Sequence, residues 1–394
     1  MKRFALYFYL IYNICVLCSC HDTVVPPDEG PFPKAEAERT VIVYMAADNS
    51  LSSLVRGDTT EMARAKHLIP EDVNFIIYLD DKANKPTIYE LSAKKGMQKF
   101  MESEEELCST NAETMLSMLR QIEYFFPARH YGITFWSHAS GWVPRRETFG
   151  QDHNHGATTQ EKEMEISELR DVLAQLPKFD YIFFDACFMQ SIEVAYELRK
   201  HANWMIGSPA EIPGPGAPYD KIMSALCQGD ARDIVRGYDS GYPGIYDQFY
   251  YSGTLLSCIC MPELDALVQA TGRFLTPLYM DRKEVSVPTP QPYCTTPNMF
   301  TFCLDMRTTM RRLLSDEDYA AWMEFFDRAV PLRTLSYTCT WHSNYCSPAY
   351  VNYPDCYGGV TMFTPMTKYD AYGWNEEYQK TSWYAAMGWQ ATGW

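Results

Sequence analysis

Short apolar runs that alternate with helix-like segments set the tightest limit on the fold of this chain. The runs are rich in β-branched and aromatic residues and lie at 40–46, 73–79, 131–136, 181–184 and 204–206. Helical spacing of apolar residues occurs at 51–68, 111–126, 166–176 and 190–199. Unbroken apolar runs are typical of strands that are buried on both faces. The alternation therefore predicts an open, mostly parallel sheet with helices on both of its faces.

The second half of the chain is less regular. After Pro213 we expect irregular structure, followed by a strand at 254–260 and helices at 263–278 and 316–330. The chain has 394 residues, of which 46% are apolar, enough for a large core with additions. We predict a core domain over 39–235 and a C-terminal α/β region over 236–394 that packs on it.

The N-terminus has the pattern of an export signal. Lys2 and Arg3 precede an apolar run at 4–17, which suits a signal peptide better than a membrane span. The run ends in LCSC at 17–20, which resembles a bacterial lipobox with Cys20 as the acylated residue. We predict a lipoprotein signal peptide over 1–19, a proline-rich tether over 20–38 and a location at the cell envelope. An ordinary cleaved signal peptide and a membrane anchor are the alternatives.

Charge and cysteine content exclude some functions. A formal net charge of −16 disfavours nucleic acid as a partner, although it would attract cationic peptides. Seven of the ten cysteines after Cys20 fall beyond residue 250, and their irregular spacing does not dictate disulfide pairs. The part of the chain after Cys20 has no CxxC or HExxH motif, so we predict no metal site and no cofactor. An EF-hand-like run is also missing, which leaves calcium without a supporting motif.

Two residues able to perform nucleophilic chemistry follow predicted strands. His138 comes after the run at 131–136, and Cys187 comes after the run at 181–184. Ligands of open α/β sheets bind beyond the carboxyl ends of the strands, and a thiol needs a nearby base to become a thiolate. The alternative is that both residues are structural, since a cysteine at a strand end is often a small buried hydrophobe.

Three segments resemble the clostripain family of cysteine peptidases, in the caspase-like clan. They are TVIVYMAADNSL at 40–51, YGITFWSHASGW at 131–142 and FDYIFFDACFMQSIEVAYEL at 179–198. GSPAEIPGPGAPYDKI at 207–222 and WYAAMGW at 383–389 are also similar to the family. The resemblance implies a caspase-like three-layer α/β/α sandwich with a C-terminal extension packed on it. It also implies cleavage after Arg or Lys, with His138 as general base and Cys187 as nucleophile.

Two acidic residues are candidates for binding a basic substrate side chain. Asp185 precedes Cys187 by two residues, so alternation along an extended segment places both side chains on one side. The resemblance also implies that this position shapes the primary pocket, and capping of the next helix is the alternative. Glu211 follows the run at 204–206 and is a candidate second acidic wall, or else a solvated loop residue.

The residue after the histidine departs from the family pattern. The family usually has glycine there, whereas this chain has Ala139. We expect the backbone N–H groups of Ala139 and Cys187 to form the oxyanion hole. A left-handed backbone at Ala139 would cost about 1 kcal/mol more than at glycine. The polar segment at 143–165 contains Arg145 and Arg146, and the resemblance suggests self-cleavage near them.

These observations together predict a monomeric cysteine endopeptidase that acts on peptides or proteins with Arg or Lys. The alternative from another class is a catalytically weak surface lipoprotein that uses the same fold to bind peptides. A transpeptidase is a third option, because it needs only an amine in place of water as the acceptor.

Overall fold

The computed structural model describes residues 32–142, 149–153, 162–242, 245–247, 250–252, 254–294, 303–335, 355 and 357–394. The predicted signal peptide, Cys20 and the first part of the tether lie outside the described residues, as do Arg145 and Arg146. The rest of the tether meets the core, because the backbone N–H of Lys34 donates to Phe125. Among the helices described, none has the length and apolarity to cross a membrane.

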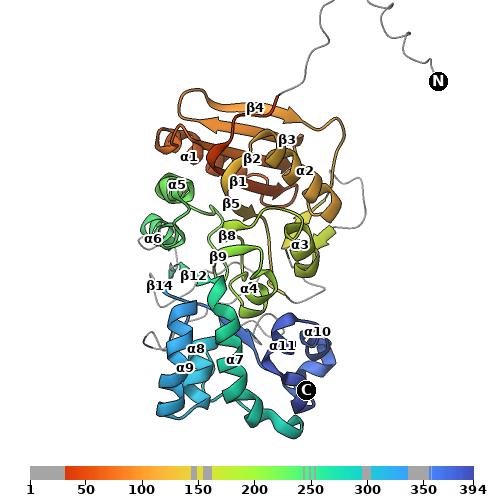
Figure 1. Cartoon of the computed structure of the whole chain (residues 1–394), viewed down its shortest axis with the longest axis vertical. Coiled ribbons are helices and arrows are strands. Elements are labelled where there is room, and N and C mark those ends of the chain that lie inside the picture. The colour runs from red at the N-terminus through yellow and green to blue at the C-terminus, as the bar shows by residue number, and fades with distance from the viewer. Residues whose placement is uncertain are drawn as a thin grey trace, which may run out of the picture.

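A central sheet organises the described chain, with its strands in the order β14-β12-β9-β8-β5-β1-β2-β3-β4 (Figure 1). Its parallel strands are β1 (Ala37–Ala47), β2 (Val73–Asp81), β5 (Ala128–Trp136), β8 (Phe179–Asp185) and β9 (Ala202–Gly207). Antiparallel strands finish both edges: β3 (Asn84–Ser92), β4 (Gly96–Glu102), β12 (Leu255–Cys260) and β14 (Leu332–Leu335). Each predicted parallel strand is present, so the expected mostly parallel sheet is confirmed.

Helices cover both faces of this sheet. On β1, Val41 and Val43 belong to one buried cluster, whereas Ile42 and Tyr44 belong to another, as the two-residue period of a strand requires. The first cluster includes residues of α1 (Val55–Ala65), α5 (Tyr219–Gln228) and α6 (Ala231–Gly241). The second includes residues of α2 (Ala112–Phe125), α3 (Ile166–Leu173) and α4 (Ile192–Leu198). The predicted three-layer α/β/α sandwich is therefore confirmed.

The expectation of irregular structure after Pro213 is wrong, because α5 and α6 follow it. Gly229 ends α5 in a left-handed conformation with a φ of 73°. The side chain of Asp230 then caps α6 by accepting from the backbone N–H groups of Arg232 and Asp233. This Gly-Asp pair interrupts the helical pattern in the sequence, although it joins two helices on the same face.

The polar segment at 143–165 also contains regular structure. Its described part includes β6 (Phe149–Asp152) and β7 (Lys162–Met164), which pair antiparallel. Further antiparallel pairs are formed by β10 (Ile245–Asp247) with β11 (Tyr250–Ser252), and by β13 (Cys303–Asp305) with β15 (Thr361–Phe363).

The predicted C-terminal region is joined closely to the core. Its helices are α7 (Leu264–Leu275), α8 (Met306–Leu313), α9 (Asp316–Ala329), α10 (Trp374–Tyr378) and α11 (Ser382–Met387). Short 3-10 helices are η1 (Lys66–Leu68), η3 (Met261–Glu263), η4 (Thr276–Arg282), η6 (Thr367–Tyr372) and η7 (Trp389–Thr392).

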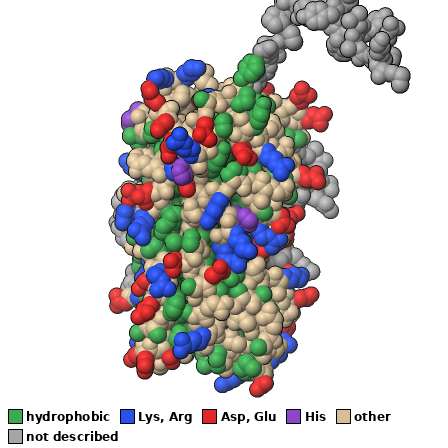
Figure 2. All heavy atoms as spheres, in the orientation of Figure 1, with side chains coloured by type: hydrophobic (Ala, Val, Ile, Leu, Met, Phe, Trp, Pro, Cys, Tyr) green, Lys and Arg blue, Asp and Glu red, His purple; other side chains and the backbone are tan. Residues whose placement is uncertain are grey.

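Contacts with α4 tie this region to the core. The buried carboxylate of Glu193 accepts from Phe363 N–H at 2.7 Å, and Glu197 accepts from Ser382 N–H at 3.2 Å. β12 and β14 also extend the sheet of the core, and the predicted boundary at 235 falls inside α6. On the face in Figure 2, acidic and basic side chains are interspersed.

Candidate active site

His138 and Cys187 follow two neighbouring parallel strands at matching positions. β5 and β8 pair directly, and the last paired positions are Trp136 and Asp185. His138 and Cys187 each come two residues after that pair. The shared register therefore brings the imidazole and the thiol to the same edge of the sheet, at the carboxyl ends of the strands.

The imidazole of His138 has a hydroxyl neighbour that the sequence did not indicate. Its Nε2 lies 2.7 Å from the Oγ of Ser50, which is in the loop after β1. Partial burial lowers the pKa of His138 below 6.5, and nearby His153 lowers it further. The ring is therefore neutral at pH 7, the form that a general base requires.

Side-chain hydrogen bonds fix the loop that carries Ser50. The amide nitrogen of Asn49 donates to the carbonyl groups of Ala46, at 2.9 Å, and Gln151, at 2.8 Å. The hydroxyl of Ser137, which directly precedes His138, also donates to Ala46, at 2.7 Å. The ends of β1 and β5 are thus joined by buried polar contacts, which hold Ser50 against the imidazole.

Cys187 is a half-buried thiol outside any disulfide, at the start of a strained turn. The N–H of Ile212 donates to its Sγ at 3.4 Å. The next residue, Phe188, has a φ of 60°, a backbone conformation that is unfavourable for any residue other than glycine. Its N–H donates to Ala210 at 3.0 Å, and this contact helps to hold the strained backbone. The segment after β9 therefore positions the thiol from the side opposite β5.

The departure from glycine at Ala139 has no backbone cost in this structure. Ala139 is not among the described residues with positive φ, whereas Gly141 has a φ of 85°. Ala139 forms a β-bridge with Phe149, and the carbonyl of His138 accepts from Gly150 N–H at 2.8 Å. The left-handed position that needs glycine is thus Gly141, two residues later.

Asp185 is buried beside the nucleophile, with 2% of its surface exposed. Its Oδ2 accepts from Ala217 N–H at 3.0 Å and from the Tyr219 hydroxyl at 3.1 Å, while its Oδ1 has no hydrogen-bond partner. Burial raises the pKa of Asp185 to about 7. The alternative role as a helix cap is wrong, because α4 begins later and Ser191 is its cap.

Glu211 and the remaining surface complete the description of the site. Glu211 is half-buried and directly precedes Ile212, the residue that contacts the thiol. Within the described ranges, no group of three or more His, Cys, Asp or Glu side chains is placed to hold a metal ion.

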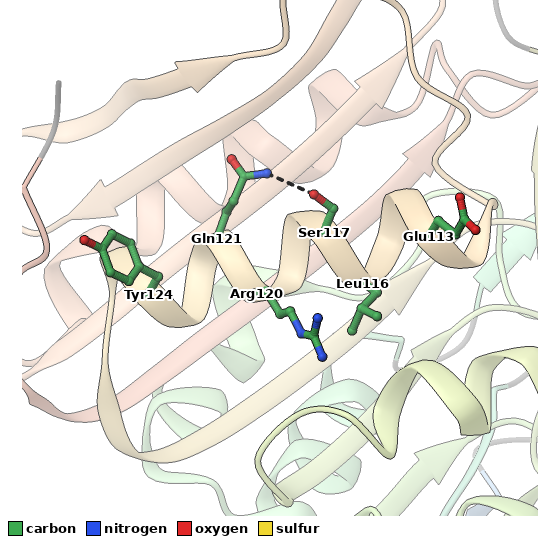
Figure 3. Close-up of a pocket in the computed structure, with 6 residues that line it drawn as sticks. All are labelled: Glu113, Leu116, Ser117, Arg120, Gln121 and Tyr124. Atoms are coloured by element: carbon green, nitrogen blue, oxygen red, sulfur yellow. Dashed lines mark hydrogen bonds between the residues drawn. The ribbon is translucent and has the colours of Figure 1, made fainter.

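A hollow of about 410 Å³ lies away from these residues, on the outer surface of α2. Figure 3 shows that all of its labelled side chains come from this one helix, and that Gln121 donates to Ser117. Because the hollow contains no residue from a strand end, we do not assign it to the active site.

A mostly parallel sheet with a cysteine and a histidine after neighbouring strands defines the class of caspase-like cysteine peptidases. A family model described as the clostripain family matches residues 43–394. The chain belongs to the clostripain family of cysteine peptidases.

Individual relatives agree with this assignment. A secreted C11 cysteine protease from Bacteroides thetaiotaomicron, solved with an irreversible peptide inhibitor, is 28% identical with a TM-score of 0.77. The alignment covers 90% of this chain and 99% of that chain. An inactive zymogen C11 protease from Parabacteroides distasonis is 26% identical with a TM-score of 0.75, over 90% of this chain and 99% of that chain.

Clostripain of Hathewaya histolytica is 24% identical over 272 residues, which are 60% of this chain. The matched part is 51% of clostripain, so the chain spans about half the length of this curated relative.

Proposed function

We propose that this chain is an exported cysteine endopeptidase that cleaves peptides or proteins after basic residues. The observation that supports it best is the shared register of β5 and β8, which places His138 and Cys187 at matching positions beyond neighbouring strands. Both positions also match the residues that the family resemblance assigns to the base and the nucleophile.

The mechanism uses the side chains and backbone of this chain. His138 accepts the thiol proton, and the thiolate of Cys187 attacks the carbonyl carbon of the scissile bond. Backbone N–H groups of Ala139 and Cys187 hold the oxyanion of the tetrahedral intermediate. His138 then protonates the leaving amine, and the acyl group stays on sulfur as a thioester. Water, deprotonated by His138, hydrolyses this thioester and restores the thiol.

Ser50 acts as a positioning residue in this scheme. Its hydroxyl contacts Nε2 of His138, which leaves Nδ1 as the nitrogen available for the thiol. A base held by a third group is the general pattern of activated nucleophiles. The buried hydrogen bonds of Asn49 supply the rigidity that such orientation needs.

Asp185 is the proposed counter-ion for the basic substrate side chain. It lies two residues before the nucleophile, and its buried Oδ1 has no hydrogen-bond partner. A buried acceptor of this kind is costly unless a donor satisfies it, and a guanidinium or ammonium group would do so. Glu211 is the proposed second acidic residue, on the segment that contacts the thiol.

The relatives support an exported protein that undergoes maturation. One similar structure is of a secreted protease and another is of an inactive zymogen. Cys294 is disulfide-bonded, which suits an oxidising compartment. We propose that Cys20 anchors the protein by a lipid at the cell envelope, and that cleavage near Arg145 or Arg146 activates it.

A series of fluorogenic peptides tests the function. The peptides carry Arg, Lys, Asp or Leu before the scissile bond and are offered to wild type and to Cys187→Ala. We expect wild type to cleave only the Arg and Lys peptides, and an electrophilic peptide ending in Arg to label Cys187. If wild type cleaves none of them and is not labelled, the peptidase proposal is wrong and the peptide-binding alternative is favoured.

A further inference from the structure

A second buried carboxylate lies beside Asp185 and comes from a different layer of the fold. Asp58, on α1, is 2% exposed, and its Oδ2 accepts from Trp136 Nε1 at 2.7 Å. A Cβ atom added to Gly216 would lie 3.1 Å from Asp185 Oδ2 and 3.3 Å from Asp58 Oδ2. Both carboxyl groups therefore converge on the backbone of Gly216.

Neither carboxyl group has a cation beside it among the residues that the structure describes. None of the ion pairs between described residues includes Asp58 or Asp185. Burial, and after it the neighbouring Asp185, raise the pKa of Asp58 to about 9. Two buried acids without a counter-ion are unfavourable for folding, so a functional reason for the pair is needed.

A buried hydroxyl without a partner points to what the pair binds. Tyr238 is fully buried, and its hydroxyl has no hydrogen-bond partner. After burial, the groups that raise the pKa of Tyr238 include Asp185, Cys187 and Asp58. Tyr238 thus lies near the two carboxylates and the nucleophile, where its oxygen can accept from a bound donor group.

We propose that Asp58 is a further acidic wall of the primary pocket, in addition to Glu211, so that an arginine side chain of the substrate lies between Asp58 and Asp185. This inference rests on the proposed peptidase function. A guanidinium presents five N–H donors in a planar fork and meets two carboxylates at once, whereas an ammonium is a compact point charge. The pocket therefore selects Arg over Lys.

The segment at 213–217 covers the two acids. Gly216 has a φ of 72°, and its carbonyl accepts from the hydroxyl of Tyr242. Gly214 and Pro215 are exposed, so the segment has solvent on its outer side. The arginine side chain enters where the backbone of Gly216 and Ala217 now lies, and its charge replaces the contacts that this backbone makes with Asp185.

Three peptides and two matched variants test the proposal. The peptides differ only before the scissile bond, where they carry Arg, Lys or citrulline, the neutral isostere of Arg. Asp58→Asn removes the group that can ionise when a cation binds beside it, but keeps an oxygen that can accept from Trp136. The control is Asp80→Asn, because Asp80 is also fully buried, with a pKa raised to about 9 by burial, but lies at the end of β2.

We expect wild type to prefer Arg over Lys. Asp58→Asn should lower kcat/KM for the Arg peptide by at least ~30-fold, the loss typical of removing one partner from a buried charge pair. In the same variant, kcat/KM for the citrulline peptide should change less than ~3-fold. Asp80→Asn should leave the ratio of kcat/KM for the Arg peptide to that for the citrulline peptide unchanged. A wild-type preference for Lys, or an unchanged Arg to citrulline ratio in Asp58→Asn, overturns the proposal while the peptidase function stands.

Peptide binding to Cys187→Ala tests the specificity of the pocket without any contribution from catalysis. Calorimetry with the uncleaved Arg and citrulline peptides should show tighter binding of Arg, and added Asp58→Asn should abolish that difference. If wild type cleaves nothing, the proposed function fails, but this binding difference still decides the pocket. If Asp58→Asn is unfolded by circular dichroism, Asp58→Ser is measured in its place, and retention of the Arg preference overturns the proposal.

Discussion

Replacing Asp58 by asparagine should stabilise the protein at neutral pH. The buried carboxyl group has a pKa of about 9 in the folded chain, against 3.8 for an unperturbed group. Below pH 3.8 the group is protonated in both the folded and the unfolded chain, so its ionisation does not reduce the stability of wild type there. As the pH rises from 3.8 to 9, the unfolded chain releases a proton that the folded chain retains, and folding becomes less favourable.

The size of the effect follows from that window. Each pH unit in this range lowers the free energy of unfolding of wild type by up to about 1.4 kcal/mol. The total loss at pH 7 is therefore up to about 4 kcal/mol. Asparagine does not ionise and can still accept from Trp136, so the variant escapes the penalty. Allowing for relaxation around the site, we expect a gain of about 2 to 4 kcal/mol at pH 7.

Unfolding measured at several pH values checks this expectation. Calorimetric melts of Cys187→Ala and of Cys187→Ala with Asp58→Asn avoid any self-cleavage. The difference in stability should be near zero at pH 3.5 and should increase steadily up to pH 8. A variant that is less stable than its parent, or a difference that does not change with pH, would refute the reasoning. A gain in stability together with lost Arg preference would be a trade-off between stability and function.

Four further outcomes follow from the site. Cys187→Ser should reduce turnover of the Arg peptide to the detection limit while the melting temperature stays the same, since a hydroxyl at this place is a poor nucleophile. Ser50→Ala should lower kcat by about 5-fold with little change in KM, as expected for one lost hydrogen bond of about 1 kcal/mol that orients the base. The acid limb of kcat/KM should lie below pH 6.5, because the lowered pKa of His138 keeps its ring neutral to more acidic pH than usual; a limb above pH 6.5 would contradict this. Gly141→Ala should destabilise the protein by about 1 kcal/mol or more in urea unfolding, because of its positive φ, whereas Ala139→Gly should leave kcat within about twofold.

The parallel strands were predictable because burial on both faces requires unbroken apolar runs. β4 lacked this signal, since its sequence GMQKFME lies mostly exposed at a sheet edge. α5 and α6 were missed because Gly229 and Asp230 break their periodicity, although these residues act as caps. In each case the misleading residues belong to an edge or an end, where packing no longer dictates the pattern.

The candidate site shows the same division between local and distant signals. His138 and Cys187 could be proposed from the sequence because each comes two residues after the end of a buried strand. The partners Ser50 and Asp58 were not found, since they meet His138 and Trp136 across 88 and 78 positions of the chain. Contacts over such separations depend on which strands become neighbours, and sequence spacing alone does not contain that information.

The order of strands has a consequence for synthesis of the chain on the ribosome. Within the described chain, β9 pairs with β8 on one side and with β12 on the other, and β12 pairs in turn with β14 at 332–335. A nascent chain that has emerged only as far as α6 therefore presents the whole free edge of β9, with its unpaired N–H and C=O groups. Such edges pair with other chains, so we expect the partly emerged chain to be prone to aggregation until β12 arrives. The emergence of β12, well past the middle of the polypeptide, thus decides when this edge of the nascent chain stops being prone to aggregation.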